Sequence, residues 1–135
     1  MELFVDDLDT SAAFYTDLLG FRTERRTAEY VSVRRGTVVL GLGPVAKLPA
    51  HGSGAGFTRD RLARGKGAGV EIVLELDDIA ELSALHDRCQ AGGVVVEPLQ
   101  HRPWGLQDFR LVDPDGYYLR VTHGDATDAG RSVPS

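Results

Sequence analysis

The sequence contains a single cysteine, Cys89, so an internal disulfide and a cysteine-rich zinc site are both excluded. Its apolar runs are short, and none approaches the roughly 20 residues that a membrane-spanning helix requires. Lysine and arginine number 15 against 20 acidic residues, which gives a formal charge of −5. Because binding to nucleic-acid phosphates needs a surplus of basic residues, this balance argues against a nucleic-acid partner. With no basic leader before the first strand-like segment, we expect a soluble, cytoplasmic protein without a membrane partner.

What is present is ordinary for a globular protein. Hydrophobic residues make up 42% and charged residues 26% of the 135 positions. A chain of this length has room for one domain, or for two small repeats that share a core. It buries roughly 65–70% of its unfolded surface on folding. We therefore expect a fold that needs neither a metal nor a disulfide for its stability.

The N-terminal part reads as a strand, a helix and three more strands. In segment 1–6, Leu3 and Val5 alternate with Glu2 and Phe4, which is typical of a strand with one buried face. A helix follows, with N-cap candidates, an apolar stripe and a terminating glycine. The caps are Asp9, Thr10 and Ser11, the stripe is Leu8, Ala12, Tyr15 and Leu19, and the helix ends at Gly20. Strands are predicted over 21–27, 30–34 and 37–42.

The same order then recurs. Residues 70–76 alternate as a strand, and Asp77-Asp78-Ile79 repeats Asp6-Asp7-Leu8 with an offset of 71 positions. A helix and three strands follow, over 94–97, 106–112 and 117–123, and the last two are joined by the turn Asp113-Pro114-Asp115-Gly116. This internal repeat predicts an α+β fold. Two tandem βαβββ repeats would form half-open sheets around a concave cleft, with the helices outside.

These patterns divide the chain into one domain and a tail. We expect a single domain over 1–123, with repeat one at 1–43, a long loop at 44–69 and repeat two at 70–123. The loop is rich in glycine and is interpreted as a long connection or a lid, and its basic part, 59–66, as a solvated surface. Residues 124–135 are expected to be a frayed tail.

Two segments carry a resemblance to a known family. "ELFVDDLDTSAAFYTDLLGF" near the start and "DFRLVDPDGYYLRVTH" near the end resemble the glyoxalase, bleomycin-resistance and ring-cleaving dioxygenase superfamily, also called vicinal oxygen chelate. The resemblance spans residues 1 to about 123. Enzymes of that superfamily hold a divalent metal with histidine and glutamate side chains on the concave face. The metal chelates two adjacent substrate oxygens and acts as a Lewis acid.

The resemblance implies ligand positions that this sequence fills poorly. The first-repeat histidine would fall just before Met1, and its counterpart in the second repeat is Glu71. The closing strand should carry a glutamate where the sequence has Arg120, whose guanidinium cannot ligate a cation. The four histidines are predicted to be surface or loop residues: His51, His86, His101 and His123. We therefore expect no metal, no cofactor and no catalytic residue.

The concave face would carry aromatic and charged groups instead. If Arg120 faces the cleft, strand alternation places Tyr118 there too, with Arg110 on the neighbouring strand. Arg120 is expected to pair with Glu71, either to contact a ligand or only to neutralise a buried charge. Trp104 lies on a proline-stiffened loop and is interpreted as a stacking surface. The predicted ligand-binding residues are Phe4, Phe57 (as a lid, with surface packing as the alternative), Glu71, Trp104, Arg110, Tyr118 and Arg120.

The preferred hypothesis is a metal-free homodimer that binds a small molecule. It would sequester an aromatic natural product or antibiotic, in the manner of a bleomycin-resistance-type self-resistance protein. The alternative is an enzyme of the same fold, a metal-dependent glyoxalase- or dioxygenase-type lyase, isomerase or thiol transferase. A third possibility is an accessory module with a vestigial cleft. The sequence favours the binding protein over the enzyme and leaves the question open.

Overall fold

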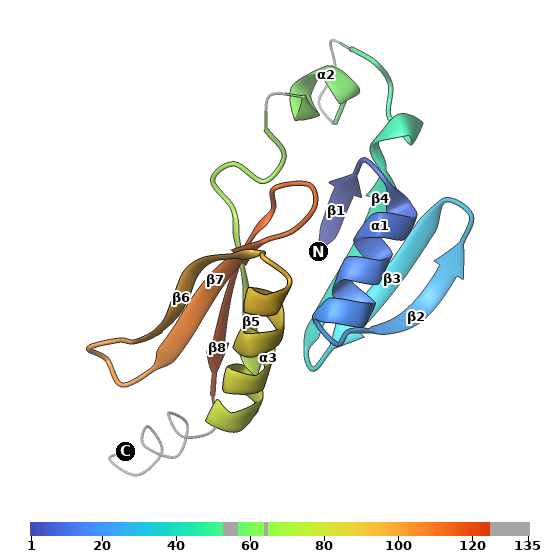
Figure 1. Ribbon diagram of the computed structural model, residues 1–135. Helices are drawn as coiled ribbons and strands as arrows, with labels where there is room; N and C mark the ends of the chain where they lie inside the picture. The colour runs from blue at the N-terminus through green and yellow to red at the C-terminus, as the bar shows by residue number, and fades with distance from the viewer. Residues whose placement is uncertain (53–56, 64, 125–135) are drawn as a thin grey trace, which may run out of the picture. The chain divides into compact units, whose positions relative to one another are not determined.

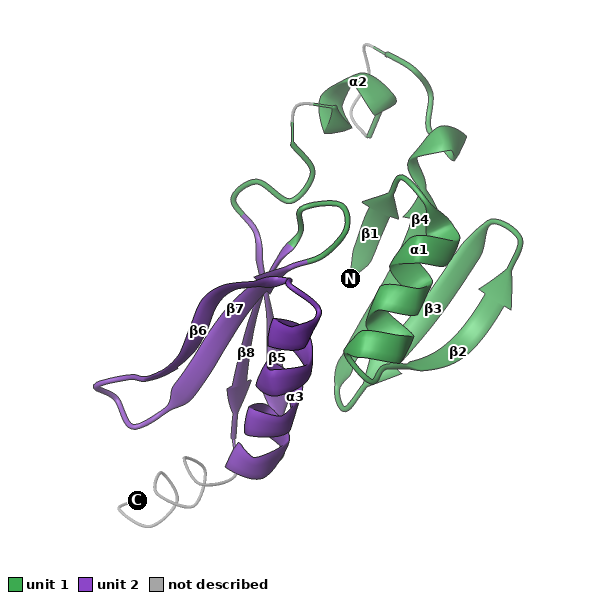
Figure 2. Ribbon diagram, in the orientation of Figure 1, with its two compact units in different colours: residues 1–69, 113–117 green, residues 70–112, 118–135 purple. Residues whose placement is uncertain are grey.

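The computed structural model describes residues 1–52, 57–63 and 65–124, which form two compact units (Figures 1 and 2). Unit 1 consists of residues 1–69 together with 113–117, and unit 2 of residues 70–112 and the segment that begins at Tyr118. The turn 113–117 lies between two strands of the second repeat, yet its contacts place it in unit 1. Beyond Gly124, the expected frayed tail lies outside the described residues.

Unit 1 contains a four-stranded sheet in the order β1-β4-β3-β2. Strands β1 and β4 are parallel, and the other pairs are antiparallel. The elements are β1 (Glu2–Val5), α1 (Leu8–Ala13), the π-helical turn η1 (Phe14–Leu18), β2 (Arg22–Thr27), β3 (Tyr30–Arg35), β4 (Val38–Pro44), the 3-10 turn η2 (Val45–Lys47) and α2 (Arg59–Leu62).

Alternation along the strands determines which face of this sheet is buried. Leu3 and Val5 are buried, as predicted, and pack with Leu40, Leu42 and the fully buried Tyr15 of η1. Helix α1 covers that face in Figure 1. The predicted caps at residues 9–11 are wrong by a few positions. The N-cap is Asp7, whose side chain accepts a hydrogen bond from the Thr10 N–H at 2.8 Å, because the helix already begins at Leu8.

Unit 2 repeats this arrangement with the sheet order β5-β8-β7-β6. Its elements are β5 (Glu71–Leu76), α3 (Ile79–Ala91), β6 (Val95–His101), β7 (Gln107–Val112) and β8 (Tyr118–His123). Buried residues of β5, β7 and β8 pack with those of α3, including Leu82, Leu85 and Cys89. The two open sheets with their helices outside confirm the predicted α+β class and its two βαβββ repeats.

Two of the four histidines are core residues, so the surface or loop prediction for them was wrong. His86 is 8% exposed, and its Nε2 accepts the Leu99 N–H at 3.2 Å. His123 is 1% exposed and accepts the Gln107 N–H through its Nε2 at 3.1 Å. Each imidazole satisfies a backbone donor that would otherwise lack a partner. Such roles depend on neighbours distant in sequence, so residue spacing does not indicate them.

The connection between the repeats contains short helices as well as loop. η2 follows β4 directly, and α2 begins after Thr58, whose side chain caps it by accepting from the Arg61 N–H. The glycines and prolines of this segment hide these short helices in the sequence pattern. Of the helices in the described parts of the chain, none is long and apolar enough to cross a membrane.

Candidate functional site: a paired-arginine sheet face and an aromatic platform

The face of the second sheet that points away from α3 is polar. Along β5, Glu71, Val73 and Glu75 are exposed and alternate with buried residues that face the helix. In the register of the sheet, Val73 lies opposite Arg120 of β8, and Arg120 lies opposite Arg110 of β7. Pairing across strands therefore places these side chains on one face.

Glu71 is held between two arginines, which we call the arginine pair. Its Oε1 accepts a hydrogen bond from Arg120 Nε at 3.0 Å, and its Oε2 accepts one from Arg110 Nε at 3.0 Å. The structure thus contains the Glu71–Arg120 ion pair expected from the sequence, and it adds Arg110 as a second partner. Both oxygens of the carboxylate are engaged by charge-assisted hydrogen bonds.

A second carboxylate extends the network toward β6. Glu97 Oε2 lies 3.5 Å from Arg110 Nη1 and accepts a hydrogen bond from the Tyr118 hydroxyl at 3.4 Å. Arg102 donates from Nε to Oδ1 of the fully buried Asp108 at 2.8 Å. Sequence reasoning missed Glu97, Arg102 and Asp108. The six-residue spacing of Arg102 and Asp108 around the hairpin turn could have indicated that these two side chains form an ion pair.

The electrostatics of the face favour an ionised Glu71. Burial raises the pKa of this carboxyl, but hydrogen bonds and charge from Arg110 and Arg120 outweigh burial, so the net pKa lies below its usual value. The pKa of the Tyr118 hydroxyl is raised by burial and by the nearby Glu97 carboxylate. At neutral pH this face therefore presents charged guanidinium and carboxylate groups beside a neutral phenol.

These residues do not fit a divalent cation. Both oxygens of Glu71 already accept hydrogen bonds from guanidinium groups, and Arg120 would repel a metal at the position where the family resemblance implies a glutamate. Throughout the described residues, no group of three His, Cys, Asp or Glu side chains could hold a metal ion.

The open face of the sheet in unit 1 provides an aromatic platform, formed by Phe4, Phe57 and the bare backbone at Gly43. The rings of Phe4 and Phe57 lie 4.7 Å apart between centroids and are tilted by 47°, and Phe57 is 57% exposed. Gly43 pairs with Phe4 across β1 and β4, and the space above it is open. Gly41, by contrast, is covered by Glu2 and Tyr30. The Gly-Leu-Gly alternation in β4 could have indicated this bare strip.

Trp104 lies in the turn between β6 and β7, at the end of that hairpin. Its side chain is 64% exposed, and the turn is closed by a hydrogen bond from the Arg102 N–H to the Leu106 carbonyl at 2.7 Å. The loop location expected from the sequence is therefore confirmed. The indole is free of the core and available to a ligand or a partner.

Within unit 2 the structure brings together Glu71, Arg110, Tyr118 and Arg120, and within unit 1 it brings Phe4 against Phe57.

Arg120→Glu tests the electrostatics of the arginine pair. The substitution removes one hydrogen bond to Glu71 and adds a second carboxylate beside it, so the pKa of Glu71 should rise from its present lowered value. The stabilisation that a lowered pKa confers is present above the unfolded pKa of about 4.3 and shrinks with this rise, so the variant should be less stable than the wild type above about pH 5. NMR titration of the glutamate carboxyl carbons measures this shift. The control is Arg22→Glu, because Arg22 is exposed and forms its ion pair with Glu24. An unchanged Glu71 pKa would contradict the assignment.

Comparison with known proteins supports the architecture over almost the whole chain. A family model described as Glyoxalase/Bleomycin resistance protein/Dioxygenase superfamily matches residues 1–121. No curated protein matches the sequence.

Solved structures with the same fold include lactoylglutathione lyase from Agrobacterium tumefaciens, at 25% identity and a TM-score of 0.67, covering 93% of this chain and 92% of that one. TioX from Micromonospora sp. ML1 is similar at 23% identity and a TM-score of 0.68, covering 91% and 94% of the two chains. A glyoxalase/bleomycin resistance protein/dioxygenase family enzyme from Burkholderia phytofirmans PsJN matches at 16% identity and a TM-score of 0.68, with 91% and 94% covered. The chain belongs to the glyoxalase, bleomycin resistance protein and dioxygenase superfamily.

Proposed function

We propose that this protein is a metal-free binding protein that sequesters an aromatic natural product or antibiotic. The observation that carries the proposal is the arginine pair. Arg120 stands where the family resemblance implies a metal-binding glutamate, and together with Arg110 it engages both oxygens of Glu71. A binding protein needs no electrophile, only apolar surface and a few directional polar groups.

The two open faces supply both kinds of group. The aromatic platform offers ring faces and a bare backbone strip to a planar ligand. Independently of that platform, Arg110, Arg120 and Tyr118 on the polar face of unit 2 offer directional hydrogen bonds, with Glu97 as an acceptor. The platform suits a planar aromatic molecule, and the polar face suits a molecule that carries both hydrogen-bond donors and acceptors.

A homodimer in the cytoplasm is part of the proposal. Several large apolar side chains are exposed on the chain alone, and burying them against a second copy would remove apolar surface from water. Outside the surfaces proposed for the ligand, they include Met1, Val70 and Val96. Sedimentation velocity at micromolar concentration should give twice the formula mass, and a stable monomer would contradict this part.

A second function is favoured by one comparison. The lactoylglutathione lyase structure is an enzyme by its name, and it is 25% identical to this chain over nearly its full length. A metal-dependent lyase, isomerase, dioxygenase or thiol transferase is therefore the competing proposal. It requires metal ligands in addition to Glu71.

A binding titration combined with metal analysis separates the two functions. Bleomycin, as a probe with a planar aromatic part, should quench the fluorescence of the single tryptophan in a saturable manner. The purified protein should hold no stoichiometric zinc, nickel, iron or manganese, and a chelator should leave its thermal midpoint unchanged. Stoichiometric metal, or a drop of many degrees on chelation, would favour the enzyme. Failure of bleomycin and a panel of planar peptide antibiotics to bind would contradict the binding function.

Gly43→Val tests the aromatic platform without disturbing the fold. An added Cβ at Gly43 meets no atom within 4 Å, and valine suits a strand, so stability should be unchanged or slightly higher. The new side chain would occupy the strip beside Phe4 and should weaken binding of bleomycin about tenfold or more. Thermal unfolding and fluorescence titration measure the two effects. Val39→Ile on the same strand is the matched control, and equal affinity in both variants would remove Gly43 from the site.

A further inference from the structure

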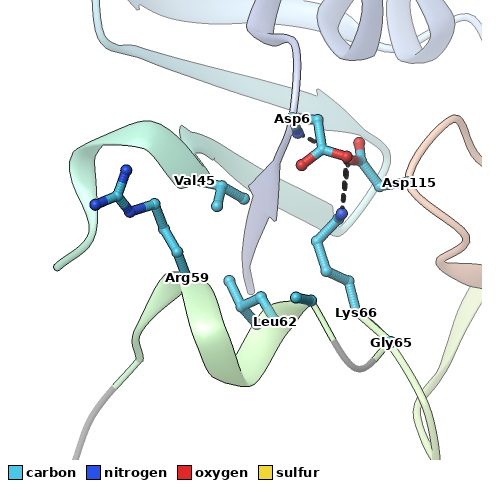
Figure 3. A pocket seen from close by; sticks show the side chains of 8 residues that line it. Asp6, Val45, Arg59, Leu62, Gly65, Lys66 and Asp115 are labelled. Atoms are coloured by element: carbon cyan, nitrogen blue, oxygen red, sulfur yellow. Dashed lines mark hydrogen bonds and ion pairs between the residues drawn. The ribbon is translucent and has the colours of Figure 1, made fainter. Parts of the chain in front are cut away.

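Unit 1 contains a cavity that the two sheet faces do not use. It has a volume of about 420 Å³, within the range of roughly 300–1,000 Å³ that is usual for small-ligand sites. It lies between α2 and the residues that directly follow strands β1 and β4 (Figure 3). The side chains that matter for its chemistry are Asp6, Val45, Arg59, Leu62, Lys66 and Asp115.

One end of the cavity is an ion cluster whose charges already pair with one another. Lys66 Nζ lies 3.0 Å from Asp6 Oδ2 and 3.5 Å from Asp115 Oδ1, and the Asp6 N–H donates to the same Asp115 oxygen at 2.8 Å. The side chains of Lys66 and Asp115 are only 12% and 3% exposed. The ammonium of Lys66 is therefore engaged by Asp6 and Asp115. Two carboxylates and one ammonium give this end of the cavity a net negative charge.

The other end of the cavity carries the guanidinium of Arg59. Arg59 is exposed at the start of α2, and no partner for its side chain occurs within the described part of the chain. In Figure 3, Val45 and Leu62 lie between Arg59 and Lys66, so an apolar stretch separates the two ends. A planar guanidinium fork matches the two oxygens of a carboxylate, and the apolar stretch suits a hydrocarbon body.

We propose that this cavity binds a small monocarboxylate with an apolar body. Its carboxylate pairs with Arg59, its hydrocarbon packs on Val45 and Leu62, and its neutral end faces the Asp6–Lys66–Asp115 cluster. A phosphate dianion fits less well, because the two carboxylates of the cluster repel a second negative charge. This site is separate from the arginine pair and the aromatic platform, so it does not depend on the function proposed above.

The test uses the full chain and three probes in an NMR titration of the ¹⁵N-labelled protein. Cyclohexanecarboxylate should give saturable shifts at the amides of Val45, Leu62, Ala63 and Lys66. Cyclohexylmethanol, which has the same body without the charge, should bind at least about fivefold more weakly, and inorganic phosphate should give no saturable shifts there.

Two variants assign the carboxylate contact. Arg59→Gln should weaken cyclohexanecarboxylate binding at least about fivefold, whereas Arg61→Gln on the same helix should leave it unchanged, because Arg61 does not line the cavity. Both positions are exposed, and the unperturbed spectrum of each variant would verify its fold. Equal binding by cyclohexylmethanol would overturn the carboxylate class. An unaffected Arg59→Gln variant, or shifts confined to other residues, would overturn the site.

Discussion

Replacing Asp113 by alanine is expected to lower the free energy of unfolding by about 3 kcal/mol. The Tyr15 hydroxyl, on a fully buried side chain, donates to Asp113 Oδ2 at 2.7 Å. The other oxygen, Oδ1, accepts the backbone N–H groups of Asp115 and Tyr117, each at 2.9 Å. Alanine would leave all three donors without their acceptor, one of them deep in the core of unit 1. Chemical denaturation followed by circular dichroism measures the loss.

Asp113→Asn is the matched control, because an amide oxygen can still accept the two backbone N–H groups. Burial raises the pKa of Asp113 and outweighs the hydrogen bonds that lower it, so the net pKa lies above its usual value. The contribution of such a group to stability is fully present below the unfolded pKa of about 4 and is lost as pH rises through the folded pKa. Asparagine does not titrate, so its stability relative to the wild type should improve as pH rises above about 4. An alanine variant within about 1 kcal/mol of the wild type would contradict the assigned role.

Trp104→Ala is expected to weaken the binding of an aromatic ligand such as bleomycin about thirtyfold, while leaving the fold intact. An aromatic side chain that a ligand buries is typically worth about 2 kcal/mol or more of binding free energy. Trp104 is 64% exposed in the turn between β6 and β7, so its replacement by alanine removes little buried apolar surface from the core. Because the variant lacks the only tryptophan, isothermal titration calorimetry is the appropriate measurement.

Ile79→Ala provides the comparison for this experiment. Ile79 is also a large apolar residue that is partly exposed, at 39%, but it lies at the start of α3 and away from the open face of the sheet. Its replacement should leave ligand affinity unchanged. If Trp104→Ala instead unfolds the protein, or binds as tightly as the wild type, Trp104 is not part of the ligand site.

The sequence by itself determined the fold class and much of the polar face of unit 2. Alternation in residues 2–5 and 71–76 identified the buried and open sides of β1 and β5, because a strand turns successive side chains to opposite faces. The repeated Asp-Asp-apolar signature marked the two repeats. From the position of Arg120 alone, its pairing with Glu71 was also predictable, since both lie on the open side of adjacent strands.

Only the tertiary structure decided which side chains satisfy distant partners. His86 of α3 accepts a backbone N–H from β6, and His123 of β8 accepts one from β7. Asp113 accepts a hydrogen bond from the hydroxyl of Tyr15, 98 positions away. The open strip above Gly43 and the cavity beside Arg59 likewise depend on how strands and loops pack within unit 1. Local patterns follow from the geometry of a single strand or helix. Hydrogen bonds and cavities between distant segments depend on register and packing, which neighbouring residues in the sequence do not specify.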